Sequence, residues 1–109
     1  MAPREITPHA LATRLASGQP TLLVDVREPW EHARVALANS RLLPLGELPR
    51  RHAELAPPPD TLVVTYCHHG IRSADAAELL TRIGWPEVVS LAGGIDAWSR
   101  EIDPSLPRY

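Results

Sequence analysis

Short apolar runs alternate with amphipathic segments along the chain, and this alternation predicts the secondary structure. The runs Thr21–Val26 and Thr61–Tyr66 are nearly continuous in apolar residues, as in strands that are covered on both faces. Apolar residues recur at helical spacing in Ser73–Ile83, which is the clearest predicted helix. The remaining predicted elements are strands at Leu42–Leu43 and Glu87–Leu91, and helices at Pro8–Ser17, after Leu48 as far as about Leu55, and from about Ile95 to Ile102.

The order of these elements predicts an α/β fold. Strands that alternate with helices favour a three-layer α/β/α arrangement, with a mostly parallel central sheet of about five strands and right-handed crossovers. In such sheets the functional site lies at the carboxyl ends of the strands. With 109 residues the chain has the length of one domain, residues 1–109, in which residues 103–109 form an extended C-terminal tail. The pattern of residues 31–40 gives no clear prediction.

Composition excludes several classes of function. The formal net charge of −2 lacks the basic excess of a nucleic-acid-binding domain. No apolar run approaches the roughly 20 residues needed to span a bilayer, so we expect no membrane partner. The single cysteine, Cys67, cannot form an intramolecular disulfide. Together with the lack of a signal-peptide-like start, this favours a cytoplasmic protein.

Cys67 directly follows a predicted strand and precedes a predicted helix. A short loop between such elements can point several backbone N–H groups inward, and the helix adds the positive end of its dipole. A thiol in this cup should react as the thiolate, and a persulfide anion would be stabilised in the same way. Gly70 suits a loop position that needs a positive φ. A lone cysteine is commonly a small buried hydrophobe, but this context places Cys67 where a nucleophile belongs.

Polar residues next to Cys67 could bind an oxyanion. Arg72 stands in the first turn of the predicted helix, where a cation opposes the helix dipole, so its fork of donors is better explained by an anionic substrate than by helix stability. His68 and His69 add donors, although each alone is more typical of an exposed loop residue. Three adjacent residues rarely converge on one ion, and the other histidines lack ligand spacing, so we expect no metal.

Four segments, in order, resemble the motifs of the rhodanese homology family, and the resemblance covers nearly the whole chain. They are the first box Leu23–Glu31, the middle box Pro44–Leu48, the loop Cys67–Ala74 of the type Cys-x-x-Gly-x-Arg-Ser, and the closing segment Leu91–Trp98. One stretch departs from the pattern. Where the family usually has a Gly-His-Ile-x-Gly-Ala type segment, residues 35–40 read Val-Ala-Leu-Ala-Asn-Ser, without the histidine or the glycines.

The resemblance implies a sulfurtransferase that carries sulfur as a persulfide on Cys67. It implies that the donor's sulfonate is bound by the loop residues His68, His69, Gly70, Ile71, Arg72 and Ser73. Asp25 and Arg27 would support the end of their strand, in keeping with an ordinary ion pair. The implied donor is a small molecule such as thiosulfate, and the acceptor is cyanide, a low-molecular-weight thiol or a thiol protein, with no cofactor.

Three other functions remain open at this point. The chain could be a persulfide relay to a protein acceptor in sulfur-cofactor biosynthesis, and residues 103–109 resemble the ends of rhodanese domains fused to sulfur-carrier-activating enzymes. Cysteine phosphatases and arsenate reductases share the fold, but their loop is Cys-x5-Arg, whereas Cys67 and Arg72 form Cys-x4-Arg. Non-catalytic rhodanese-like binding modules have usually lost the cysteine that this chain retains.

Overall fold

Residues 4–109 of the computed structural model form, within that described range, one five-stranded sheet in which every neighbouring pair is parallel. The strand order is β1-β5-β4-β2-β3. The strands are β1 (Glu5–Ile6), β2 (Thr21–Asp25), β3 (Arg41–Leu42), β4 (Leu62–Tyr66) and β5 (Val88–Leu91). The predicted α/β fold with a parallel central sheet is confirmed.

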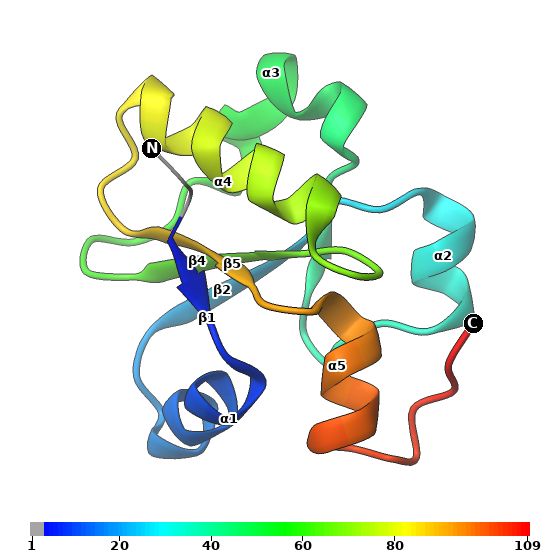
Figure 1. Ribbon diagram of the computed structural model, residues 1–109. Helices are drawn as coiled ribbons and strands as arrows, with labels where there is room; N and C mark the ends of the chain where they lie inside the picture. The colour runs from blue at the N-terminus through cyan, green and yellow to red at the C-terminus, as the bar shows by residue number, and fades with distance from the viewer. Residues whose placement is uncertain (1–3) are drawn as a thin grey trace.

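Helices cover both faces of the sheet (Figure 1). On one face lie α3 (Leu48–Arg51) and α4 (Ile71–Ile83), and on the other lie α1 (Pro8–Ser17) and α5 (Gly94–Glu101). The short α2 (Pro29–Arg34) follows β2 and lies beside the end of the chain, and the single-turn 3-10 segments η1 (Leu45–Glu47) and η2 (His52–Leu55) flank α3. No helix among residues 4–109 is long and apolar enough to cross a membrane.

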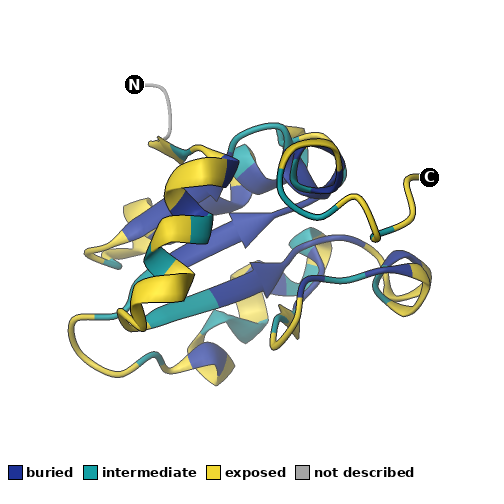
Figure 2. Cartoon of the chain, turned by 90° about the horizontal axis from the view of Figure 1, so that it is seen from below, coloured by how far each residue is buried: buried dark blue, intermediate teal, exposed yellow. Residues whose placement is uncertain are grey.

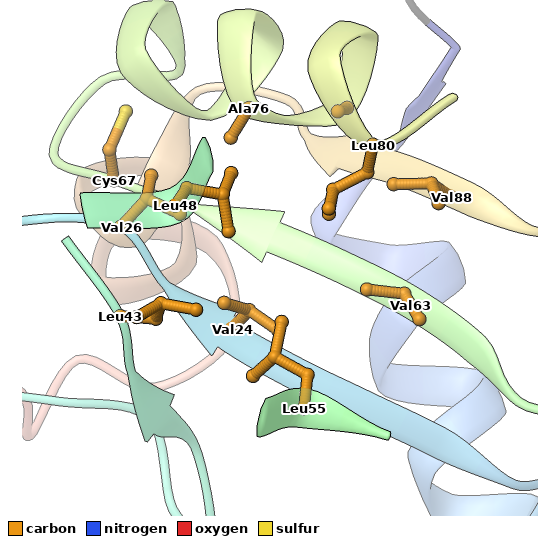
Figure 3. Packing of buried hydrophobic residues seen from close by; sticks show 11 residues of the cluster. Val24, Val26, Leu43, Leu48, Leu55, Val63, Cys67, Ala76, Leu80 and Val88 are labelled. Atoms are coloured by element: carbon orange, nitrogen blue, oxygen red, sulfur yellow. The ribbon is translucent and has the colours of Figure 1, made fainter. Parts of the chain in front are cut away.

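The sheet is apolar on both faces because alternate residues of its central strands enter two separate cores. Val24 and Val63 pack toward α3 and α4 (Figure 3), whereas Leu23 and Val64 pack toward α1 and α5. The strands are dark blue throughout their central parts in Figure 2, and the yellow surface is on the outward sides of the helices. This two-sided burial explains why the strand segments read as nearly continuous apolar runs.

The structure differs from the predicted elements mainly where an element is short. β1 is only two residues long and pairs with the edge of β5, so it has no pattern to detect. The helix expected to end near Leu55 is split into α3 and η2, and α4 begins at Ile71, two residues before the predicted start. The other boundaries agree within about two residues, the usual uncertainty of an element end.

The stretch 31–40, which gave no clear prediction, begins within α2. Glu28 and Glu31 form a capping box around its start, and Pro29 occupies the first turn. The segment that departs from the family pattern then turns at Asn39, whose φ is 64°. Asparagine is one of the few residues that adopt this left-handed conformation readily, so it serves where the family has glycine.

Candidate active site

The side chain of Cys67 lies at the carboxyl end of β4, at the edge of the apolar core. It is 1% exposed and belongs to the same cluster as Val26 and Leu48 (Figure 3). The thiol is therefore deeper than the sequence suggested. Burial of this kind keeps water away from a reactive sulfur while the loop supplies the polar contacts.

The loop turns its backbone N–H groups toward the sulfur, as the sequence predicted. The N–H of Gly70 donates to Cys67 Sγ at 3.1 Å, and the N–H of Ser73 donates at 3.4 Å. The second donor belongs to the first turn of α4, so the positive end of that helix dipole points at the sulfur. Gly70 has φ of 108°, a conformation that lets the loop curl back on itself.

The start of α5 holds the loop from its other side. The N–H of Ile95 donates to the carbonyl of Cys67 at 2.8 Å, and the N–H of Asp96 donates to the carbonyl of His68 at 3.1 Å. Gly94 lies against these two carbonyls, has φ of 63°, and has no room for a Cβ. The loop therefore sits between two helix starts, and this contribution of α5 was missed when its segment was read only as a family motif.

Ser73 joins α4 to the strand beneath it. Its hydroxyl contacts Cys67 Sγ at 3.5 Å, donates to the carbonyl of Gly70 at 3.2 Å, and lies 2.8 Å from the hydroxyl of Ser90 on β5. Thr65 donates its hydroxyl to the Ser73 carbonyl at 2.8 Å. All five residues of this network are buried or half-buried, so the network fixes the position of the donors around the sulfur.

Arg72 has a partner that the sequence did not reveal. Its two terminal nitrogens donate to the two carboxylate oxygens of Glu31, at 2.7 Å and 3.0 Å. Glu31 is only 4% exposed, and it also accepts from the Glu28 N–H at 3.0 Å and the Tyr109 hydroxyl at 2.7 Å. The Arg72 guanidinium therefore lies beside the loop, held in a bidentate pair across 41 residues of sequence.

These contacts stabilise the charged form of Glu31. The hydrogen bonds from Arg72, more than offsetting the effect of burial, lower the pKa of Glu31 to about 2. A carboxylate whose pKa is lower in the folded chain contributes stability above its ordinary pKa, and that stability is lost as the pH falls.

We expect Glu31→Gln to be less stable than the wild type at pH 7, by at most about 3 kcal/mol, and the difference to vanish as the pH falls from about 5 to 2. The reason is that protonation removes from wild-type Glu31 the same charge that the substitution removes. Urea unfolding at a series of pH values measures the difference. Glu87→Gln, which removes an exposed carboxylate at the other end of the sheet, is the control. A difference that stays constant with pH would contradict the assignment.

Asp25 and Arg27 form a fully buried ion pair at the end of β2. Arg27 donates to Asp25 through its backbone N–H at 3.0 Å, its Nε at 2.9 Å and one terminal nitrogen at 2.8 Å. That same terminal nitrogen reaches the carbonyl of Val35, and His32 Nδ1 lies 2.8 Å from Asp25 Oδ2, the oxygen that this nitrogen also binds. None of these hydrogen bonds involves Cys67. The geometry of Asp25 and Arg27 is therefore consistent with a role in supporting the strand end.

Three rings stack over the loop. His68 lies between His69 and Tyr109, with centroid separations of 3.9 Å to each and an angle of only 6° to Tyr109. Burial and the neighbouring His69 both lower the pKa of His68, so it is neutral near pH 7. His69 is exposed, and Ile71 is 77% exposed, so these two side chains point away from the sulfur cup.

Among the described residues, His68, His69 and Asp96 bring possible ligand atoms within 4.8 Å of one another. Stacked imidazoles direct their nitrogen lone pairs along parallel planes and not at one point. The Asp96 carboxylate also already accepts from Arg108 at 2.9 Å and from Arg100 at 3.2 Å. The arrangement therefore does not fit a metal site.

A cavity of about 530 Å³ lies far from this chemistry, at the amino ends of β4 and β5. It is lined by His52, Trp85 and the three prolines of residues 57–59, among others, and by none of the residues predicted to act on sulfur. The sulfur cup is by contrast formed by backbone N–H groups around a single buried sulfur, which suits a small reagent rather than a large ligand.

Comparison with known proteins gives a family match over most of the chain. The rhodanese-like domain model matches residues 7–101. A sulfurtransferase of Allochromatium vinosum is 41% identical over 96 residues, which cover 88% of this chain and 88% of that protein. The probable adenylyltransferase/sulfurtransferase MoeZ of Mycobacterium tuberculosis is 35% identical over 104 residues, which cover 95% of this chain.

The chain spans about a quarter, 26%, of the length of the MoeZ protein. Among solved structures, a thiosulfate sulfurtransferase from Pseudomonas aeruginosa superposes with a TM-score of 0.86 at 25% identity. That alignment covers 97% of this chain and 20% of the other. The fold of nearly the whole chain thus has a counterpart in a solved structure.

Proposed function

Because the chain belongs to the rhodanese-like sulfurtransferase family, we propose that it transfers sulfane sulfur through a persulfide on Cys67. The donor is thiosulfate or another sulfane-sulfur compound such as a persulfide. The acceptor is a thiophile: cyanide, a low-molecular-weight thiol or a protein thiol. The acceptor and the cytoplasmic location stay predictions from the sequence.

One observation carries the proposal: two backbone N–H groups converge on the sulfur of the only cysteine, at the start of a helix. Donors in this position stabilise negative charge on that sulfur in the thiolate. They can stabilise the persulfide anion as well, because its terminal sulfur would occupy the same cup. The contacts of Ser73 with Thr65, Cys67, Gly70 and Ser90 hold these N–H groups in place. The negative charge on the sulfur is therefore stabilised by donors that do not have to move during the reaction.

The transfer balances without any redox partner. The Cys67 thiolate attacks the sulfane sulfur of thiosulfate, a bond forms between the two sulfurs, and the bond to the sulfonate sulfur breaks. Sulfite leaves with the electron pair, and Cys67 keeps the persulfide anion. An acceptor thiolate or cyanide then takes the terminal sulfur, which releases the Cys67 thiolate.

Persulfide relay is the second candidate function, and two observations favour it. The name of the MoeZ relative combines an adenylyltransferase with a sulfurtransferase, and the alignment with MoeZ covers 95% of this chain. Residues 103–109 also dock on the fold, through the Ser99 hydroxyl on the Leu106 carbonyl at 2.6 Å and through the Tyr109 contacts. In a relay the donor would be a protein persulfide and the acceptor a protein thiol.

The experiment that tests the proposal is mass spectrometry of the intact protein after incubation with thiosulfate. We expect the addition of one sulfur atom, located on Cys67 by peptide mapping and removed by cyanide or dithiothreitol. Protein alkylated beforehand with iodoacetamide is the control and should add nothing. If thiosulfate and a small-molecule persulfide both leave the mass of the untreated protein unchanged, the proposal is wrong.

Loop length predicts which substrates the cup rejects. With Cys67 and Arg72 in a Cys-x4-Arg loop, the donors close on one atom above the sulfur, whereas phosphoryl transfer needs donors for each equatorial oxygen. We therefore expect no Cys67-dependent hydrolysis of p-nitrophenyl phosphate above the buffer rate. Release of p-nitrophenol is followed by absorbance, with Cys67→Ser as the control. Turnover that disappears in this variant would favour the phosphatase alternative.

A further inference from the structure

Arg72 in the cysteine loop and Arg27 after β2 are each matched by a carboxylate. Both terminal nitrogens of Arg72 are bound by Glu31, and Arg27 is held by Asp25 in a pair with fully buried side chains. A guanidinium that is bound face to face by a carboxylate offers little net charge to an incoming anion. The loop therefore lacks the strong local positive charge that the sequence alone, with its Arg72, suggested.

Two further arginines share one carboxylate beside the loop. Arg100 and Arg108 share the carboxylate of Asp96, and their side chains are 48% and 58% exposed, so water screens them. The ring of His68, which stacks over the loop, is partly buried next to another imidazole and is uncharged near neutral pH. What the cup itself offers is the partial charge of two backbone N–H groups and one helix terminus.

Tyr109 holds the balancing charge in position. Its hydroxyl donates to Glu31 at 2.7 Å and accepts from Arg27 at 2.5 Å, which joins the two ion pairs into one network. Its ring is parallel to His68 and lies edge-on to Trp30, with centroids 6.0 Å apart. Tyr109 thus keeps Glu31 directed at Arg72, and Figure 1 shows the end of the chain lying beside α2, the helix that carries Glu31.

On the basis of the proposed function, we infer that the site selects sulfane-sulfur donors with one negative charge over dianionic thiosulfate. The favoured class comprises thiosulfonates, R–SO₂–S⁻, and persulfides, R–S–S⁻. Glu31 is the residue that sets the preference, and Tyr109 is a positioning residue that acts through it. The inference goes beyond sulfur transfer itself, because it names the charge of the donor that the cup accepts.

Charge counting along the reaction explains the preference. In the attack of the Cys67 thiolate on a thiosulfonate, two unit negative charges meet, a sulfinate leaves with the electron pair, and the persulfide keeps one charge. With thiosulfate, three unit charges meet in the same cup, and sulfite leaves as a dianion. The extra charge approaches Glu31, and Arg72 offers it little attraction because both of its terminal nitrogens are already bound by that carboxylate.

The test compares two donors of similar shape that differ in charge, methanethiosulfonate and thiosulfate. The second-order rate of sulfur addition to Cys67 is measured for each by mass spectrometry, and the ratio is divided by the same ratio for free cysteine, which removes the intrinsic reactivity of the donors. For the wild type we expect a normalised preference for methanethiosulfonate of about tenfold. In Glu31→Gln the preference should fall about fivefold or more, chiefly through a lower KM for thiosulfate.

Three further variants separate charge from structure. Glu31→Asp keeps the charge and should restore most of the preference, whereas Glu87→Gln, with the same loss of charge at the far end of the sheet, should change nothing. Tyr109→Phe keeps the ring but loses both hydrogen bonds, and it should give an intermediate preference. A normalised wild-type preference near one, or a preference that Glu31→Gln leaves unchanged, would overturn the inference.

Salt dependence supplies a second measurement that needs no variant. If the cup carries no free positive charge, added salt screens repulsion, and the rate with thiosulfate should rise with ionic strength more than the rate with methanethiosulfonate. A thiosulfate rate that falls with salt would show that Arg72 is available to the donor and would contradict the inference. Addition of sulfur from neither donor would instead contradict the proposed function.

Discussion

Replacing Cys67 with serine is expected to abolish sulfur transfer, with a loss of at least about 1,000-fold in a thiosulfate:cyanide assay. The hydroxyl of serine cannot form a persulfide, and no other residue of the chain carries a thiol. The fold should survive, because the smaller hydroxyl would still be within reach of the Gly70 N–H and the Ser73 hydroxyl. Thiocyanate formation measures activity, and a circular-dichroism melting curve checks the fold.

A matched control for this variant is Ser40→Ala. It removes a hydroxyl that bonds to Tyr66 and the Leu37 carbonyl, away from the sulfur, and should leave transfer unchanged. Activity of Cys67→Ser near the wild-type value would refute the persulfide mechanism. Loss of both activity and the cooperative melting transition would instead be resolved by Cys67→Ala, whose apolar methyl group suits the core cluster around Val26 and Leu48.

Replacing Gly94 with alanine is expected to lower the free energy of unfolding by more than about 3 kcal/mol. A Cβ at this position would lie 2.5 Å from the carbonyl oxygen of Cys67 and would also overlap the carbonyl of His68. Both are backbone atoms, so neither can move without opening the loop. The φ of 63° adds strain of its own for any residue with a side chain.

Two other glycines separate these causes. Gly84 has φ of 113° but open space around it, so Gly84→Ala should show backbone strain alone, about 1 kcal/mol. Gly46 has neither a positive φ nor a close neighbour, and Gly46→Ala should change stability by less than about 0.5 kcal/mol. Urea unfolding measures all three. A Gly94→Ala value no larger than that of Gly84→Ala would mean that α5 does not clamp the cysteine loop.

The sequence was informative wherever a pattern extends over several residues. The central strands β2 and β4 are buried on both faces, so their apolar runs were readable, and α4 carries a full helical period. The cup around Cys67 followed from the same reasoning, since a strand, a short loop and a helix in succession fix where backbone donors point.

The contacts that were missed join residues far apart in the chain. Glu31 pairs with Arg72, and Tyr109 reaches Arg27 across 82 residues, and no local pattern marks such partners. Two hints were nevertheless present: an acidic residue within a recognised motif, and an aromatic residue in a polar tail. The short elements β1 and α2 were not predicted for another reason. They are stabilised by strand pairing and by helix capping, and neither carries a periodic pattern of apolar residues that the sequence could reveal.

The all-parallel sheet also has a bearing on how fast the protein folds. A parallel pairing closes a long stretch of chain, and such non-local contacts make folding slow. The pairing of β4 with β5 encloses the cysteine loop and α4, so the sulfur cup should assemble together with the central strands. The pairing of β1 with β5 lies at an edge of the sheet and involves only two residues of each strand. We therefore expect amide hydrogens at β1 to exchange through local fraying, and those of the cup only when the sheet itself opens.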